Sequence, residues 1–395
     1  MAFQAPIRLL AAARPSVSTP LLVAIASSTA VFAATPFLLP AIADDYDVSV
    51  STAGWMSTVQ LAGFVIASWV GGRFLRPVRN VFVIGMLLGV TANLAAAVAP
   101  TFELLAATRF VSGVSLGLAA WIAWQAAFGD SDKTGDVAVV GPLVGTIVAP
   151  GIALILETAG LQWLFVTLAA ITALPLIWTS EVPSVERLRP HRTRHAATRA
   201  ARAILLGLGI ITLGGSSVFV YGAAIGRDLV GLSPLTVSLL FSGNALAAIP
   251  SARWSGRRGP AGVWFLATAA CAMALSVSRN GVVFGLAIVL WGFVFFMGIP
   301  AAFNLLAARS NFPEERAGDA QAVMALGRVF GPLVGGALLA AGSTGTLGIV
   351  SSGILTTGAL LLLYVDRDRF VVSRRGPTQA LSSPQALQDA QRPGR

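Results

Sequence analysis

The five residues Gly141-Pro142-Leu143-Val144-Gly145 occur a second time in this chain, as Gly331-Pro332-Leu333-Val334-Gly335. Each copy lies within a long apolar stretch, and Gly327 extends the second copy's glycine spacing of four. Glycines four residues apart share one helix face and let another helix approach closely. The proline bends a membrane helix, which is tolerated where neighbouring helices cover the freed backbone groups. Alanine- and glycine-rich helices can contain the same short sequence twice by chance. The two copies lie at corresponding positions in the two halves of the chain, which favours duplication of a helical unit.

The composition indicates a protein with many membrane spans. The chain has 395 residues, of which 55% are hydrophobic and only 11% charged, whereas soluble proteins have about 25% charged residues. The net charge of +10 comes from basic residues in short loops between apolar stretches, which is a membrane-topology pattern, so we expect no nucleic-acid partner. The lone Cys271 excludes an intramolecular disulfide. His191 and His195 lie in an arginine-rich loop and read as solvated residues, so we expect no metal and no cofactor.

Twelve apolar segments are long enough to be membrane helices. They fall in two sets of six on either side of a basic stretch. The expected spans are 19–43, 52–72, 80–99, 102–125, 137–157, 161–179, 203–225, 234–252, 261–278, 282–307, 317–341 and 346–364. The expected organisation is a cytoplasmic lead at 1–18, a six-helix bundle at 19–179, a basic cytoplasmic linker at 180–202, a second six-helix bundle at 203–365 and a disordered cytoplasmic tail at 366–395.

The loop charges set the orientation. With both termini in the cytoplasm, all but four of the 27 basic residues fall on the cytoplasmic side, the exceptions being Arg109, Arg227, Arg279 and Arg328. An odd number of spans in either half would scramble this bias. The sequence therefore predicts an all-α, multi-pass protein of the cell membrane with cytoplasmic N- and C-termini.

Three motifs follow the spans in order. After the second span, Gly71, Arg76 and Arg79 fit a loop of the type Gly-x-x-x-Asp-Arg-x-Gly-Arg-Lys, although Leu75 and Val78 replace the Asp and the second Gly. A corresponding loop after the eighth span also lacks the acid, and its matching residues are Arg253, Arg257 and Arg258.

The other two motifs lie within spans. Arg109 in the fourth span is followed four residues later by Gly113. This fits a motif in which an Arg precedes a Gly by four positions, except that Ser112 stands where the motif has Gln. A phrase of the type Gly-x-x-x-Gly-Pro-x-x-Gly-Gly is partly present in the fifth span and complete in the eleventh. Its matching residues are Gly141, Pro142 and Gly145 in the first copy, and Gly327, Gly331, Pro332, Gly335 and Gly336 in the second.

In this order and spacing, the motifs resemble those of the major facilitator superfamily, and the likeness covers nearly the whole chain. The resemblance implies two six-helix bundles around a central cavity that opens alternately to each side, with substrate bound near the midplane. In that family the loop acid helps to lock one conformation. With Leu75 in its place, the lock is expected to be weaker or made by other contacts.

Arg328 is the leading candidate for the substrate site. A guanidinium at the bilayer centre costs at least about 2.5–3.5 kcal/mol, so it should face a cavity or a partner. Ala138 occupies the matching place in the fifth span, and a charge in only one of two related halves is hard to explain as packing. We expect Arg328 to face the central cavity. For Arg109 two roles stay open, a structural hydrogen-bonding residue and a part of proton coupling.

The carboxylates point to the substrate's charge. All seventeen lie in loops, in the tail or near span ends, and none is expected at the midplane, where carriers of cationic drugs commonly need one. This favours a neutral or anionic substrate. Glu157 is the candidate for a titrating group, or else an ordinary interfacial residue. Four further polar residues are candidates for the cavity wall, or else for interhelical hydrogen bonds: Tyr221, Asn244, Asn304 and Gln321. Trp121 and Trp124 read as interface anchors.

The function predicted from these features is proton-coupled efflux of a small organic compound by alternating access, carried out by a monomer in the lipid bilayer. Two alternatives stay open: an uptake symporter for a small organic anion, and a non-transporting sensor or assembly protein on the same scaffold. A loop of the type Gly-x-x-x-x-Gly-Lys-Ser/Thr is absent, which disfavours an ATP-driven pump. The two histidines share one loop far from any paired nucleophile, so we expect no enzyme activity.

Overall fold

The computed structural model describes residues 17–127, 131–182, 195–252 and 258–374. Within these residues all regular secondary structure is helical, and turns and short irregular segments join the helices. The elements are α2 (Thr19–Asp45), α3 (Val50–Ala53), α4 (Trp55–Phe74), α5 (Arg79–Ala97), α6 (Phe102–Ala127), α7 (Ser131–Thr158), α8 (Gly160–Ala173), the 3₁₀ helix η1 (Leu174–Glu181), α9 (Arg199–Phe219), α10 (Gly222–Asp228), α11 (Pro234–Ala252), α12 (Ala261–Val277), α13 (Gly281–Ala308), α14 (Pro313–Ala341) and α15 (Thr344–Arg374).

The expected twelve spans of an all-helical membrane protein are confirmed. Within the described residues, eleven helical segments are long and apolar enough to cross a bilayer. The remaining segment, α12, is apolar and has 17 residues. Three spans are interrupted: α3 and α4 form one, α8 and η1 another, and α9 and α10 a third.

Local sequence explains where several helices begin and end. The side chains of Ser49, Thr198 and Asn280 precede α3, α9 and α13 and accept hydrogen bonds from backbone N–H groups of the first turn. Gly160 separates α7 from α8 with a φ of 83°, a left-handed conformation that glycine adopts without steric cost. Pro175 near the start of η1 has no N–H to continue the α-helix before it.

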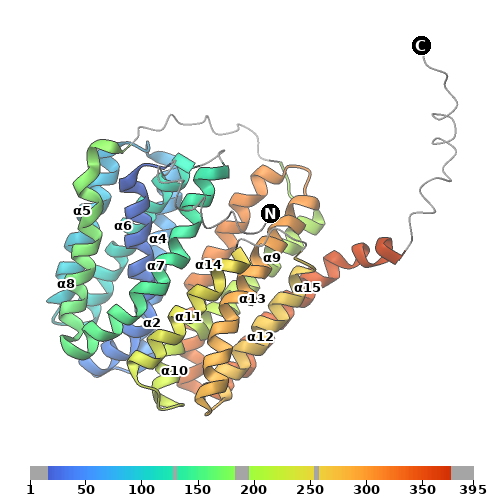
Figure 1. The fold of residues 1–395 in the computed structure, drawn as a ribbon. Coiled ribbons are helices and arrows are strands. Elements are labelled where there is room, and N and C mark those ends of the chain that lie inside the picture. The colour runs from blue at the N-terminus through green and yellow to red at the C-terminus, as the bar shows by residue number, and fades with distance from the viewer. Residues whose placement is uncertain (1–16, 128–130, 183–194, 253–257, 375–395) are drawn as a thin grey trace, which may run out of the picture.

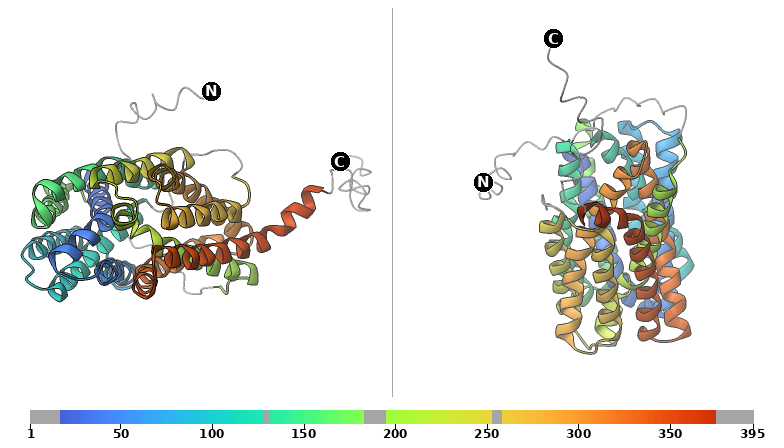
Figure 2. Two further views of the ribbon diagram at one scale, coloured as in Figure 1. Left: turned by 90° about the horizontal axis from the view of Figure 1, so that it is seen from below. Right: turned by 90° about the vertical axis from the view of Figure 1, so that its right-hand side faces the viewer.

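The helices pack in two groups, one of α2 to η1 and one of α9 to α15. In Figure 1 the blue-to-green group and the yellow-to-red group stand next to one another, and the left view of Figure 2 looks along the helices of both. Within the described residues, the most extensive contacts between the two halves join α7 with α11, α4 with α14, α3 with α14, and α2 with α10. The two related helices α7 and α14 therefore each reach across to the opposite half.

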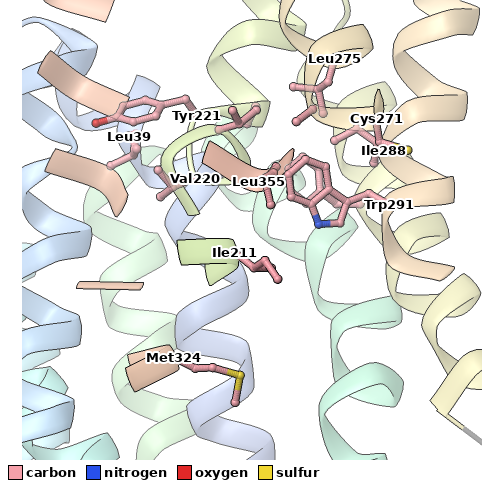
Figure 3. Packing of buried hydrophobic residues seen from close by; sticks show 14 of the residues in the cluster. Leu39, Ile211, Val220, Tyr221, Cys271, Leu275, Ile288, Trp291, Met324 and Leu355 are labelled. Atoms are coloured by element: carbon pink, nitrogen blue, oxygen red, sulfur yellow. The ribbon is translucent and has the colours of Figure 1, made fainter. Parts of the chain in front are cut away.

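We name the two ends of the bundle by one residue each. The Asp44 end contains the end of α2, the short helices α3 and α10 and the connections α5–α6, α7–α8, α12–α13 and α14–α15. The Arg79 end contains the starts of α2 and α9 and the connections α4–α5, α11–α12 and α13–α14. A buried apolar cluster with side chains from both halves includes Leu39, Tyr221 and Trp291, which Figure 3 labels.

The last helix is longer than the expected twelfth span, 346–364. Helix α15 continues to Arg374, past the expected tail boundary at 366, and Figure 1 shows its last turns projecting from the bundle. No proline or glycine interrupts this stretch, and the Arg367 guanidinium lies 4.2 Å from the Tyr364 ring centroid, one helical turn away. Residues 183–194 of the expected linker and 375–395 of the expected tail lie outside the described residues.

The end of the linker is held by the second half. The Thr198 hydroxyl donates to the Arg309 carbonyl at 2.7 Å, and the His195 ring stacks on Phe312 with centroids 3.7 Å apart. Arg316 donates to the His195 carbonyl at 2.6 Å. These contacts fix the chain before α9 against the α13–α14 connection, so the last residues of the expected linker pack on the second half.

Candidate substrate cavity

A cavity of about 680 Å³ lies between the two halves. Both halves contribute to its wall, through α2, α4, α6 and α7 on one side and α9, α11, α13 and α14 on the other. The described lining residues are Ile25, Thr29, Phe32, Ala33, Thr35, Pro36, Ser57, Leu61, Phe64, Trp124, Val137, Gly141, Pro142, Thr212, Gly215, Ser216, Phe219, Val220, Asn244, Ala245, Ala248, Trp291, Gly292, Phe295, Phe296, Arg328 and Pro332. A space of this size accommodates a small organic molecule.

The wall is mainly apolar and aromatic. Seven of the lining residues are Phe or Trp, and the rings of Phe219 and Trp291 pack with centroids 5.5 Å apart. Hydroxyl groups come from Thr29, Thr35, Ser57, Thr212 and Ser216. Among the described lining residues, Arg328 is the only ionisable side chain, so the fixed charge of this wall is positive.

Arg328 lies on the cavity face of α14, one turn before Pro332. Its side chain is exposed to the cavity but surrounded by protein in the middle of a membrane-spanning helix. Among the described residues, no carboxylate pairs with it. A cation in such a place is costly without a partner, so the cavity is suited to a ligand that brings electron-rich or negative atoms.

Arg109 lies elsewhere, in the core of the first half. It is 1% exposed, its Nη1 donates to the Asn93 side-chain oxygen at 3.0 Å, and its guanidinium lies 5.4 Å from the Phe165 ring centroid. Its Nη2 has no hydrogen-bond partner among the described residues. Asn93 in turn donates to the Gly89 carbonyl at 2.9 Å. The arrangement ties α6 to α5 and α8.

Two more of the sequence candidates lie near the cavity or on it. Asn244 lines it, and its amide nitrogen donates to the Ile288 carbonyl at 2.7 Å, which orients the side chain from α11 toward α13. Tyr221 is fully buried at the junction of α9 and α10, next to lining residue Val220, and its hydroxyl donates to the Pro332 carbonyl. Tyr221 therefore packs against the cavity-lining residues on the side that faces away from the cavity.

The remaining three candidates are exposed on the molecule and are not among the described lining residues: Glu157 near the end of α7, Asn304 on α13 and Gln321 on α14. The seven sequence candidates are thus not gathered at one place. The structure brings Arg328 and Asn244 to the same cavity, with Tyr221 behind it.

The motif residues of the loop after α4 are divided between packing and the surface. Gly71 is buried under the Trp121 ring, since an added Cβ would lie 2.7 Å from a ring carbon. Arg76 and Arg79 are exposed, and Arg79 donates to the Thr179 hydroxyl at 3.2 Å, which joins the start of α5 to η1.

In the corresponding loop after α11, Arg253 and Arg257 lie outside the described residues. Arg258 donates to the Ser251 carbonyl at 2.6 Å, near the end of α11, and to the Phe296 carbonyl of α13 at 3.4 Å. Partial burial lowers the pKa of the Arg258 guanidinium below its ordinary value. This arginine therefore satisfies helix carbonyls.

The glycine motifs serve close helix packing. At Gly113, an added Cβ would overlap the backbone carbonyl of Gln60, so α4 and α6 are in backbone contact there. In α14, Gly327, Gly331 and Gly335 lie along α9 in the same way, each against backbone atoms of that helix.

The first copy of the repeated phrase has different neighbours. Gly141 and Pro142 line the cavity, and an added Cβ at Gly141 would lie 3.9 Å from its nearest neighbour, the Thr29 hydroxyl oxygen. Gly145 faces the other half, where an added Cβ would lie 3.3 Å from the Ala245 Cβ. Identical sequences therefore have different packing roles, although both prolines, Pro142 and Pro332, lie on the cavity wall.

Sequence reasoning missed the aromatic wall. Trp124 read as an interface anchor, but it lines the cavity, while Trp121 is buried. Phe32, Phe219 and Trp291 gave no sequence signal, because a residue facing the cavity and one facing lipid are equally apolar in a spanning helix.

The twelve-span fold, the two helical halves and the cavity between them define a membrane transporter. The chain belongs to the Major Facilitator Superfamily, whose family model matches residues 21–328. Transporters of this family are carriers without enzyme activity, and alternating access is general among them.

A relative from Streptomyces lividans, named chloramphenicol resistance protein, is 27% identical in an alignment of 371 positions that covers 87% of this chain and 93% of that protein. Among solved structures, the human organic anion transporter MFSD10 (TETRAN) is similar with a TM-score of 0.63 and 17% identity, over 87% of this chain and 97% of that one. A D-xylose-proton symporter is similar with a TM-score of 0.68 and 16% identity, over 87% and 95%. The structural likenesses support the fold.

Proposed function

We propose that this protein exports a small organic compound from the cell by alternating access, and that its substrate is neutral or anionic. The proposed charge of the substrate rests on one observation: Arg328 is the only ionisable side chain among the described residues that line the cavity. A cationic substrate would meet uncompensated repulsion there. A neutral compound with electron-rich atoms, or an anion, would instead stabilise the guanidinium.

The aromatic wall further favours an aromatic substrate. Seven Phe and Trp rings line the space, and such rings bind flat apolar groups by stacking and area burial. The similarity to a chloramphenicol resistance protein supports export as the direction. Chloramphenicol, an uncharged aromatic compound, is therefore the first compound to test.

The orientation and the energy source are part of the same proposal. The basic loops favour the Arg79 end as the cytoplasmic one, with both termini there, in the cell membrane. The proton gradient is the proposed driving force, and a monomer the proposed working unit. Glu157 stays the proposed coupling residue, although it is not among the described lining residues, so coupling would reach the site through helix movement.

A second candidate is uptake of a small organic anion. It is favoured by the same Arg328, together with the absence of a carboxylate among the described lining residues. The two candidates differ in direction and are separated by transport in vesicles of known orientation.

The test uses purified full-length protein and a panel of anionic, neutral and cationic aromatic compounds that includes chloramphenicol. We expect neutral or anionic members to raise the melting temperature of the wild type, and Arg328→Ala to lose the effect for the anions. Arg328→Lys keeps the charge and should retain part of it. Stabilisation of the wild type and Arg328→Ala alike by lipophilic cations would overturn the proposal.

Direction is measured separately, in proteoliposomes with an imposed proton gradient. Export coupled to protons predicts accumulation of substrate in vesicles whose interior corresponds to the outside of the cell and is acidic. Accumulation that requires the opposite gradient would favour uptake.

A further inference from the structure

Three helix prolines lie on the described cavity wall, Pro36, Pro142 and Pro332, and for two of them, Pro36 and Pro332, the residue four positions earlier is also a described lining residue. Proline has no N–H, so the carbonyl four residues earlier in a helix lacks its usual donor. In α2 the proline is Pro36 and the carbonyl belongs to Phe32. In α14 the proline is Pro332 and the carbonyl belongs to Arg328.

Both gaps face the cavity. Residues four apart lie on one face of a helix, with the backbone hydrogen bond that would join them on the same side. Phe32 and Pro36 both line the cavity, and so do Arg328 and Pro332. One gap therefore belongs to each half of the protein, and the ligand space lies between the halves.

Such acceptors are costly in a mainly apolar wall. An unpaired carbonyl within a membrane-spanning segment is tolerated where it is covered by protein or lines a polar space. At Pro300 in α13, a side chain of the protein supplies the missing donor. Pro300 leaves the carbonyl of Phe296 without its helical partner, and this carbonyl accepts a hydrogen bond from Arg258 at 3.4 Å. For the carbonyls of Phe32 and Arg328, the cavity is the available source of a donor.

We infer that these two carbonyls are acceptors for the substrate, which is therefore an aromatic compound that carries hydroxyl or amide N–H donors. The inference rests on the proposed function and narrows its substrate class. The donors of the ligand bind the carbonyls of α2 and α14, while its electron-rich or anionic group faces the Arg328 guanidinium. Bound in this way, one molecule contacts both halves through backbone as well as side chains.

The test replaces each proline by alanine, which restores the missing N–H and closes the helix hydrogen bond. The variants are Pro36→Ala and Pro332→Ala. Pro150→Ala in α7 is the matched control, since Pro150 is an internal helix proline that is not among the described lining residues. The melting temperature of each variant without ligand shows whether it is folded.

Two pairs of probes isolate the donor. Chloramphenicol is compared with its 1,3-di-O-methyl ether, and 3-(4-hydroxyphenyl)propionate with 3-(4-methoxyphenyl)propionate. Within each pair the aromatic ring and the other polar groups are kept, and hydroxyl hydrogens are replaced by methyl groups. Affinity for the full-length protein is measured by calorimetry or by thermal stabilisation.

We expect wild type and Pro150→Ala to bind the donor-bearing member of at least one pair about three- to tenfold more tightly, as one net hydrogen bond supplies. In Pro36→Ala or Pro332→Ala this ratio should fall toward one. Equal ratios in all four proteins, or no donor preference in wild type, would overturn this inference while leaving the proposed function standing. Failure of wild type to bind any probe in either pair would overturn this inference, and failure across the wider panel would overturn the proposed function as well.

Discussion

The Tyr221 hydroxyl donates a hydrogen bond to the Pro332 carbonyl at 2.8 Å, deep between the two halves of the transporter. Tyr221 lies at the bend between α9 and α10 and is fully buried. Its ring contacts Gly335 of its own half, while its hydroxyl lies against Gly54 of the other half, where an added Cβ would overlap it. This one side chain therefore fills the junction of α3, α4, α9 and α14 at the Asp44 end.

Removing the hydroxyl alone should be mild. We expect Tyr221→Phe to lower stability by about 0.5–1.5 kcal/mol, because it loses one buried hydrogen bond and keeps the ring packing. Gly54→Ala should cost much more, since its methyl would occupy the place of the Tyr221 oxygen and approach the Ser51 carbonyl at 3.1 Å. Melting temperatures in detergent measure both. In the double variant Gly54→Ala with Tyr221→Phe, part of the loss should be recovered, and an unchanged loss would contradict the proposed contact.

A second prediction concerns the repeated pentapeptide. The first glycine of each copy, Gly141 and Gly331, has different surroundings. An added Cβ at Gly331 would lie 2.5 Å from the Ser216 Cβ and 2.9 Å from the Leu213 carbonyl oxygen, so α9 or α14 must shift. At Gly141 the nearest atom is 3.9 Å away. We expect Gly331→Ala to lower the melting temperature strongly, by an equivalent of about 1–3 kcal/mol, and Gly141→Ala to change it little. Similar effects of the two substitutions would argue against the packing of α14 on α9.

The buried Arg109 makes a third prediction, through its partner Asn93. Asn93→Leu removes the acceptor of a guanidinium that is 1% exposed, and should cost about 1.5–3 kcal/mol. Replacing both partners, as Asn93→Leu with Arg109→Met, should be less harmful than the single substitution, because no unpaired charge stays in the core. The control is Thr108→Val, which removes only a hydroxyl bonded to the Leu105 carbonyl one turn earlier in its own helix. A single variant as stable as the wild type would exclude the structural role of the Arg109–Asn93 pair.

The ion pair of Asp44 and Arg227 joins the two halves at a distance of 2.8 Å. Its side chains are 65% and 35% exposed, so water screens the attraction and its net contribution should be below about 1 kcal/mol. We expect Asp44→Asn to leave the melting temperature nearly unchanged, and its small effect to vanish in high salt. Asp228→Asn, which removes the second carboxylate bonded to Arg227, serves for comparison. A large salt-independent loss in Asp44→Asn would mean that this pair holds the halves together.

Some of this structure followed from the sequence alone. Twelve apolar segments and the basic loops predicted an all-helical membrane protein, and Gly71, Gly113 and the repeated glycine phrase resembled one transporter family. These features are local or periodic, and bilayer thickness and the need to satisfy backbone groups translate them directly into helices. The placement of Arg328 in an apolar helix also predicted a cavity or a partner, since its charge is costly anywhere else.

Tertiary structure alone decided which side chains share a surface. The helices are apolar on all sides, because lipid and neighbouring helices are equally apolar surroundings, so periodicity does not tell the cavity face from the lipid face. Thus Trp124 lines the cavity, Asn304 and Gln321 do not lie among its described residues, and Tyr221 stands behind its wall. For the same reason the two copies of one pentapeptide, indistinguishable in the chain, have different neighbours: the packing partner of a helix face is determined by the arrangement of the other helices.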